Sequence, residues 1–146
     1  MAAPNASSAG DAAFTMELRV RYVECDMQER VFNAHYLTWV DMAHTEAIDE
    51  IAGGYKSLTA GGIDLVVAAA ELQFRAPARF DDRLVVHTVI HPPGNTSLRS
   101  DFTITRDDEV LAECRMTHVC VDTDGYRKQP WPDWLRAKLP AKSIAD

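Results

Sequence analysis

The order of the segment patterns constrains the fold most, because one long helical pattern is followed by four strand patterns with no second long helix between them. In the helical pattern, residues 34–51, apolar side chains recur every three or four positions, and the pair Gly53 and Gly54 then predicts its end. The strand patterns cover residues 64–76, 83–91, 98–105 and 110–122. One amphipathic helix on one face of an antiparallel sheet is an α+β arrangement.

Another strand pattern precedes the helix. Apolar residues mark it at alternate positions, namely Phe14, Met16, Leu18, Val20 and Tyr22. We expect this strand to end near Glu24 or Cys25. The helix is apolar over much of its circumference, which predicts that the resulting five-stranded sheet wraps around it. The other face of such a sheet and its edge strands commonly need cover, which favours a dimer.

The length of 146 residues suits one domain with a sizeable core. Residues 1–13 are small, polar and without periodicity, which is typical of a flexible leader, so we expect a single domain over residues 14–146. Near the end of the chain, Trp131, Trp134 and Leu135 indicate a short docked helix that starts at about Pro132.

Composition excludes several classes of partner and places the protein in the cytoplasm. The formal net charge of -7 argues against nonspecific binding to nucleic acid or to an anionic membrane. The three cysteines have no CxxC spacing, which is typical of reduced thiols. No apolar run approaches the roughly 18 residues of a membrane span, and the first residues lack the features of a signal peptide.

Motifs for metals and nucleotides are missing as well. His87, His91 and His118 fall on separate strand patterns without a companion ligand at metal-binding spacing, so we predict no metal. The sequence has no Walker loop, no GxGxxG and no GxSxG, so nucleotide hydrolysis, dinucleotide binding and a serine triad lack support.

A carboxylate stands between the first strand and the helix. Asp26 lies in a short polar loop, and the helix is entered at Asn33 or Ala34. A carboxylate that faces the first turn of a helix lies opposite free backbone N–H groups and the positive end of the helix dipole. This geometry suits an active site, where Asp26 activates a reactant and the N–H groups stabilise an oxyanion. The alternative is that Asp26 merely caps the loop.

The segment DMQERVFNAHY, residues 26–36, resembles the motif of hotdog-fold acyl-CoA thioesterases of the 4-hydroxybenzoyl-CoA thioesterase type. Two more segments, ELQFRAPARFDDRLVV at 71–86 and AECRMTHVCVDTDGYRKQP at 112–130, are similar to the same family and stand in the same order. The resemblance covers roughly residues 17–132. It implies a hotdog fold, a homodimer or homotetramer, and hydrolysis of an acyl-CoA thioester to free acid and CoA. No cofactor is expected, because CoA is part of the substrate.

The resemblance also implies roles for individual residues. The family's catalytic Asp falls on Asp26, either as nucleophile or as general base, and the backbone N–H that polarises the thioester carbonyl falls on Asn33. Tyr36 and Val40 are candidates for the acyl pocket, although such residues on a helix are by default core. Two interpretations of His35 stay open, a pocket residue or a surface histidine at the helix start.

Cationic side chains bind phosphate groups well, and Arg75 is our candidate to bind the phosphates of CoA. One residue departs from the family motif, because Glu29 stands where the family has glycine, three positions after the Asp. Glycine permits positive φ or close approach of a ligand, so the shape of the loop is in question. Glu29 either adds a second carboxylate to the site or pairs with Arg30 in solvent.

Three alternatives remain from the sequence. Hydrolysis of an acyl carrier protein thioester would use the same site, although the net charge of -7 disfavours an acidic carrier protein as partner. A non-catalytic hotdog protein that binds an acyl thioester is favoured by Glu29 alone. In a second branch of hotdog thioesterases the carboxylate lies on the helix, where Glu46 would be the candidate. The acyl group itself depends on pocket volume, which sequence does not determine.

Overall fold

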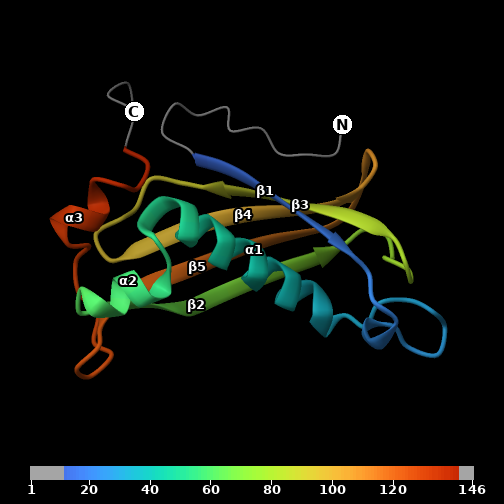
Figure 1. Ribbon diagram of the computed structural model, residues 1–146, viewed down its shortest axis with the longest axis horizontal. Helices are drawn as coiled ribbons and strands as arrows, with labels where there is room; N and C mark the ends of the chain where they lie inside the picture. The colour runs from blue at the N-terminus through green and yellow to red at the C-terminus, as the bar shows by residue number, and fades with distance from the viewer. Residues whose placement is uncertain (1–11, 142–146) are drawn as a thin grey trace.

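The computed structural model describes residues 12–141 and shows one five-stranded antiparallel sheet with a long helix across one face (Figure 1). The strands lie in the order β1-β3-β4-β5-β2. The elements along the chain are β1 Ala12–Arg19, the 3-10 turn η1 Tyr22–Glu24, α1 Ala34–Ala52, α2 Tyr55–Ala60, β2 Ile63–Phe74, β3 Arg83–Ile90, β4 Ser97–Arg106, β5 Glu109–Asp122 and α3 Asp133–Arg136. The predicted α+β arrangement is confirmed.

Helix α1 follows from its periodic apolar face. Eight of its residues are buried at intervals of one to four positions: Tyr36, Trp39, Val40, Ala43, His44, Ala47, Ile48 and Ala52. The polar residues between them, such as Asp41, Thr45 and Asp49, face solvent. The helix ends at Gly53, whose φ of 78° lies in the left-handed region that glycine adopts without steric cost, and its N–H bonds the Asp49 carbonyl.

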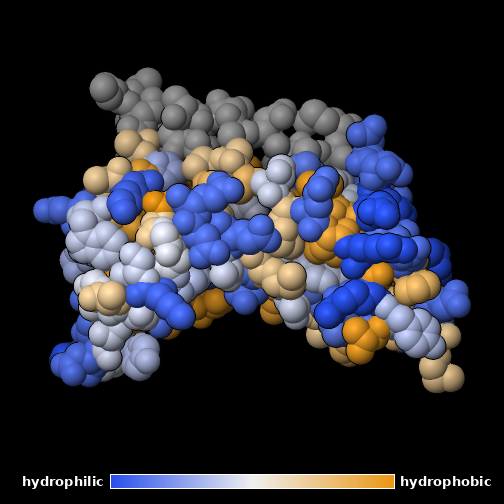
Figure 2. All heavy atoms as spheres, in the orientation of Figure 1, coloured by the Kyte–Doolittle hydropathy of each residue, from blue (hydrophilic) through white to orange (hydrophobic). Residues whose placement is uncertain are grey.

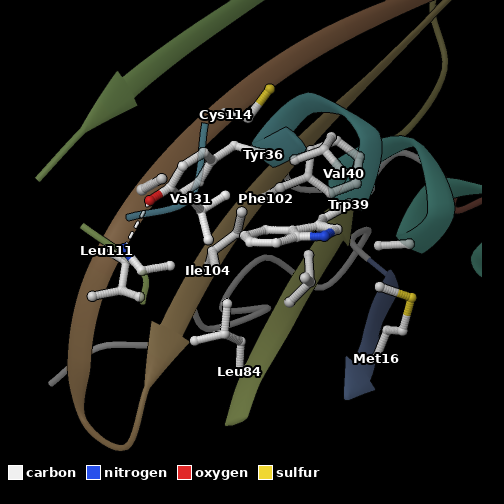
Figure 3. Close-up of a cluster of buried hydrophobic side chains, with 14 of the residues drawn as sticks. Met16, Val31, Tyr36, Trp39, Val40, Leu84, Phe102, Ile104, Leu111 and Cys114 are labelled. Carbon is white, nitrogen blue, oxygen red and sulfur yellow. Dashed lines mark hydrogen bonds between the residues drawn. The ribbon is translucent and has the colours of Figure 1, made fainter. Parts of the chain in front are cut away.

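The core lies between α1 and the face of the sheet that the helix covers. Figure 3 shows its end nearest the helix start, where the Trp39 indole lies among Tyr36, Phe102 and Leu84. Farther along the helix a second buried cluster gathers around Ile48 and receives side chains from α2, from the sheet and from the C-terminal segment. Residues from every strand contribute to these two clusters, so the sheet and the helix stabilise one another.

The first strand is shorter than its alternation predicted. It ends at Arg19, and the backbone of Val20 then pairs with the segment before β3, accepting from the Asp81 N–H at 3.1 Å and donating to the Asp82 carbonyl at 2.9 Å. The chain turns into η1 immediately afterwards, and Tyr22, predicted on the inward face, is 77% exposed. Alternation of residue type cannot reveal where a strand loses its neighbour.

Two other features differ from the sequence predictions or add to them. Ala12 and Ala13, assigned to the leader, belong to β1 and pair with Ile90 and Val89, whereas residues 1–11 lie outside the described residues. Helix α2 was not predicted, and the short C-terminal helix falls at Asp133–Arg136 as expected. Within residues 12–141, no helix combines the length and the apolar character needed to cross a membrane.

Strand β2 forms one edge of the sheet and is largely exposed. It pairs only with β5, and its six residues 66–71 are exposed, including Val66 and Val67. The register of the pairing shifts between Val67 and Ala69. An edge strand presents unpaired backbone groups, and apolar residues beside them favour association with another strand.

Candidate active site

The loop between η1 and α1 holds Asp26 in a tight turn. The Asp26 N–H donates to the Arg30 carbonyl at 2.8 Å, and the Glu29 N–H donates to the Asp26 carbonyl at 3.0 Å. On the side chain, Oδ1 accepts from the N–H groups of Gln28 at 2.8 Å and Arg30 at 3.4 Å. Within the described part of the chain, Oδ2 has no hydrogen-bond partner. One carboxylate oxygen of this exposed residue therefore orients the side chain, and the second is left without a hydrogen bond from residues 12–141.

Glu29 adopts the conformation for which a glycine is best suited. Its φ is 62°, in the left-handed region, and its side chain is exposed. A residue with a Cβ pays about 1 to 2 kcal/mol for that conformation. The turn is therefore retained with glutamate at the position where the related motif has glycine. No ion pair between Glu29 and Arg30 occurs in the described structure.

The start of α1 contributes backbone donors. Asn33 is the N-cap residue, and its side chain makes no capping hydrogen bond. The preceding N–H, of Phe32, bonds the Glu24 carbonyl at 3.0 Å, whereas the N–H of Asn33 finds no acceptor in residues 12–141. An unpaired N–H at the positive end of a helix dipole is an anion-binding group.

These groups meet at one pocket of about 290 Å³. It is lined by Asp26, Arg30, Val31, Asn33, Tyr36, Phe74, Arg75, Ala76 and Pro77. The loop and the helix start supply its polar wall, and the end of β2 with the following Ala-Pro segment supplies the apolar one. The structure therefore brings together four of the six residues that the sequence analysis selected, namely Asp26, Asn33, Tyr36 and Arg75.

Tyr36 forms the base of the pocket and links its two walls. Its ring contacts the edge of Phe74, with centroids 5.1 Å apart, and its hydroxyl accepts the Ala78 N–H at 2.8 Å. Figure 3 shows this hydroxyl pointing away from the helix. Burial raises the pKa of the Tyr36 phenol. The phenol is therefore neutral at pH 7 and fixes the segment that follows β2.

The remaining candidates lie elsewhere. Val40 is fully buried in the core, so it supports the helix from behind the pocket instead of lining it. His35 is half-buried against the Phe32 ring, with centroids 6.2 Å apart, and also does not line the pocket. Glu46 is exposed on α1. Arg75 lines the pocket, but its guanidinium binds Glu113 at 2.9 Å.

Another hollow of about 350 Å³ lies where Arg115 bridges to Asp101, but it contains neither Asp26 nor the helix start. No group of three or more potential metal ligands occurs among residues 12–141.

The sequence analysis missed one residue beside the site, Glu24. Its side chain is 3% exposed and accepts hydrogen bonds from Arg21 and Trp39. A signal for it existed, because Glu24 continues the even-numbered alternation of the first strand and so falls on the inward face. Charged residues are seldom buried without partners, so a carboxylate on an inward face indicates a specific hydrogen-bonded site.

Comparison with known proteins agrees with the fold. The family described as "Thioesterase-like superfamily" matches residues 11–139. The acyl-CoA thioester hydrolase YbgC of Escherichia coli O6:H1 is 30% identical over 127 residues, which cover 86% of this chain and 95% of that protein. The long-chain acyl-CoA thioesterase FadM of Escherichia coli K12 is 26% identical over 125 residues, covering 84% and 94% of the two chains.

Among solved structures, the 1,4-dihydroxy-2-naphthoyl-CoA thioesterase Slr0204 from Synechocystis superposes with a TM-score of 0.80 at 23% identity. The match covers 88% of this chain and 96% of that one. The predicted hotdog fold is therefore confirmed, with α1 as the helix that the sheet wraps. The family match over nearly the whole described chain shows that the protein belongs to the Thioesterase-like superfamily.

Proposed function

We propose that the protein hydrolyses an acyl-CoA thioester to the free acid and CoA, with Asp26 and the Asn33 N–H as the reacting groups. Relatives named for this reaction match over most of their length. The observation that carries the proposal is the pocket itself, which is lined by Asp26, with one carboxylate oxygen unbonded within residues 12–141, and by Asn33, whose N–H at the helix start is unpaired over the same residues.

The chemistry follows from these two groups. When the thioester carbonyl lies at the helix start, the Asn33 N–H stabilises the negative charge that develops on its oxygen. Asp26 then acts in one of two ways. It attacks the carbonyl carbon, CoA leaves as thiolate, and water hydrolyses the resulting anhydride; or it takes a proton from water, which attacks the carbonyl and expels the thiolate. In the second route Asp26 then gives its proton to the thiolate, so either route regenerates the Asp26 carboxylate.

The binding roles extend this scheme. The apolar wall around Tyr36 and Phe74 receives the acyl group. Arg75, at the same pocket, binds the phosphates of CoA after exchanging its exposed pairing with Glu113, because surface ion pairs contribute only about 0 to 1 kcal/mol. His35 is retained as a substrate-binding candidate at the rim. No cofactor enters the reaction.

Assembly belongs to the same proposal. The exposed edge of β2, with its run of valine and alanine residues, pairs with a second copy to form a homodimer, and two dimers form a tetramer in the alternative assembly. A second copy covers the free backbone groups of the edge strand. We place the protein in the cytoplasm.

A panel of acyl-CoAs that differ in chain length and aromaticity, assayed by release of free thiol, tests the function. We expect wild-type turnover on at least one member and a loss of roughly 100-fold or more in kcat for Asp26→Asn, the scale of losing a catalytic acid or base. Full activity of Asp26→Asn would contradict the site assignment. Acyl carrier protein thioesters, assayed in parallel, test the alternative that the acyl group is carried by a protein and not by CoA.

The non-catalytic alternative has lost its support. It rested on Glu29, which put the shape of the loop in question, yet the residue adopts the left-handed conformation that the turn needs. Binding of acyl-CoA without turnover on any thioester would revive it.

A further inference from the structure

Glu24 is the one acidic side chain buried in residues 12–141. It does not line the pocket and is not in contact with any group assigned to the reaction through its carboxylate. A buried carboxylate is costly unless hydrogen bonds replace its lost hydration. The partners of this carboxylate therefore show which parts of the chain it connects.

The carboxylate joins two elements that are distant in sequence. Oε1 accepts the Arg21 N–H at 2.8 Å, which closes η1, and Oε2 accepts the Trp39 Nε1–H on helix α1 at 2.8 Å. The guanidinium of Arg21 adds a contact to Oε2 at 3.3 Å. Burial alone would raise the pKa of Glu24, but these hydrogen bonds and the Arg21 charge outweigh it and lower the pKa, so Glu24 is ionised at neutral pH.

The backbone of the same residue makes a second link. The Glu24 carbonyl accepts the Phe32 N–H at 3.0 Å, and Cys25 forms an antiparallel bridge with Val31. The residue after Phe32 is Asn33, and Asp26 stands two residues after Glu24. One residue therefore ties the segment that carries the carboxylate to the segment that carries the oxyanion donor.

The fold has other means of holding these elements. The Trp39 ring is enclosed by the core and contacts the Tyr36 ring, with centroids 5.1 Å apart (Figure 3). The backbone of Val20 is paired to the segment before β3. Backbone hydrogen bonds, such as that from the Phe32 N–H to the Glu24 carbonyl, hold the two sides of the loop together. The Glu24 carboxylate adds a side-chain link from η1 to helix α1, which fixes how the loop is oriented on the helix.

We infer that Glu24 is a positioning residue, which sets the separation and orientation of the Asp26 carboxylate and the Asn33 N–H by tying η1 to helix α1 through Trp39. The inference rests on the proposed function for its kinetic consequence. Small displacements of reacting groups cost large factors in rate, so the expected effect falls on kcat, with little change in KM.

Three variants separate this role from general stability. Glu24→Ala removes the link, Glu24→Gln keeps the shape and one acceptor oxygen, and Trp39→Phe keeps the core ring but removes the donor. We expect kcat to fall about 10- to 100-fold in Glu24→Ala with KM within about 3-fold, and Glu24→Gln to recover at least part of the loss. The matched control is Glu50→Ala. Glu50 is an exposed acid on helix α1, the helix that carries Trp39, and its variant should have the kinetics of wild type.

The double variant Glu24→Ala with Trp39→Phe tests the coupling. Its loss in kcat should be clearly smaller than the product of the two single losses, because both variants break the same link. Circular dichroism at the assay temperature identifies the folded fraction, and Trp39→Phe, which removes the donor of the same link, carries the test if Glu24→Ala does not fold. Multiplicative losses, or folded Glu24→Ala or Trp39→Phe with kcat within 2-fold of wild type, would overturn the inference.

A readout without substrate keeps the inference apart from the proposed function. In two-dimensional amide NMR spectra, Glu24→Gln should shift the signals of Asp26, Gln28 and Asn33, whereas Glu50→Ala should leave them in place. Unshifted loop amides would refute the positioning role even in an active enzyme. Shifted amides in a protein that turns over no thioester would support the link and reject the proposed function alone.

Discussion

The imidazole rings of His44 and His118 stack face to face in the core, with centroids 3.8 Å apart and planes inclined by 9°. The Tyr55 hydroxyl lies 3.1 Å from His44 Nδ1, whereas His44 Nε2 and His118 Nδ1 have no partner among the described residues. Both histidines are buried in the core, away from the pocket that holds Asp26.

This pair predicts a loss of stability on mild acidification. Burial lowers the pKa of His44 to about 3, together with the charge of His118, and burial lowers that of His118 to about 4, against 6.5 for an ordinary histidine. Below pH 6.5 the unfolded chain therefore binds protons that the folded chain does not, so the free energy of unfolding falls as pH drops towards 4. Each histidine contributes a slope of up to about 1.4 kcal/mol per pH unit.

Urea unfolding at pH 7, 6 and 5 measures that slope. His118→Leu should make it shallower, because one of the histidines whose folded pKa is lowered is removed, while His44 and His87, whose pKa values burial also lowers, remain. Thr45→Leu, at an exposed position without a titrating group, is the control and should leave the slope unchanged. An identical slope in wild type and His118→Leu would contradict the prediction.

Asp26 has a loop role and a chemical role that two substitutions separate. Asp26→Asn keeps an acceptor oxygen for the Gln28 N–H, so its stability should stay within about 0.5 kcal/mol of wild type, whereas Asp26→Ala should lose about 1 kcal/mol. Both should lose roughly 100-fold or more in kcat. Urea midpoints beside thiol-release kinetics provide the measurement, and equal stability of the two variants would show that the loop does not depend on the carboxylate.

Glu29→Gly should stabilise the protein. Glycine adopts the φ of 62° without the steric cost of a Cβ, and after its own loss of chain entropy the expected net gain is up to about 1 kcal/mol in the free energy of unfolding. Activity should be retained. Gln28→Gly is the control, since Gln28 has no positive φ and should lose stability. A less stable Glu29→Gly variant would argue that the glutamate side chain makes a contact worth more than the strain.

The β2 edge predicts the effect of a charge on assembly. Val67→Lys places an ammonium group on the exposed edge of the sheet, where charged residues oppose edge-to-edge pairing. Sedimentation velocity should show a dimer or tetramer for wild type and a shift towards monomer for the variant. The variant Thr45→Lys, at an exposed position of α1, serves as the matched control and should keep the assembly of wild type. A wild-type monomer at micromolar concentration would refute the proposed assembly.

Much of the fold was predictable, because periodicity records which side of an element is buried. The start of α1 at Ala34, its end before Gly53 and the four later strands fall within two residues of the predicted ranges. The end of β1 and helix α2 were not predicted correctly, because both depend on contacts with segments that are distant in sequence. Val20 pairs with Asp82 instead of continuing the strand, and Tyr22 keeps the alternation although it is exposed.

The candidate site was also predictable only in part. Asp26, Asn33 and Tyr36 were selected from one local motif, because the spacing between a loop carboxylate and a helix start is encoded within a few residues. Val40 was selected with them as a pocket candidate, although its position on the apolar face of the helix already favoured the core, where it is fully buried. Glu24 was missed because its partner Trp39 stands 15 residues away, across the loop.

The sequence by itself determined the order of the elements, the face of α1 that is buried and the local pairing of a carboxylate with a helix N-terminus. These features depend on the period of side chains along a backbone and on neighbours within one or two turns. Only the tertiary structure decided that Glu29 keeps the turn, that Tyr36 holds Ala78, and that the buried Glu24 carboxylate ties both reacting segments to one helix. Those contacts join residues whose proximity exists only after the chain has folded.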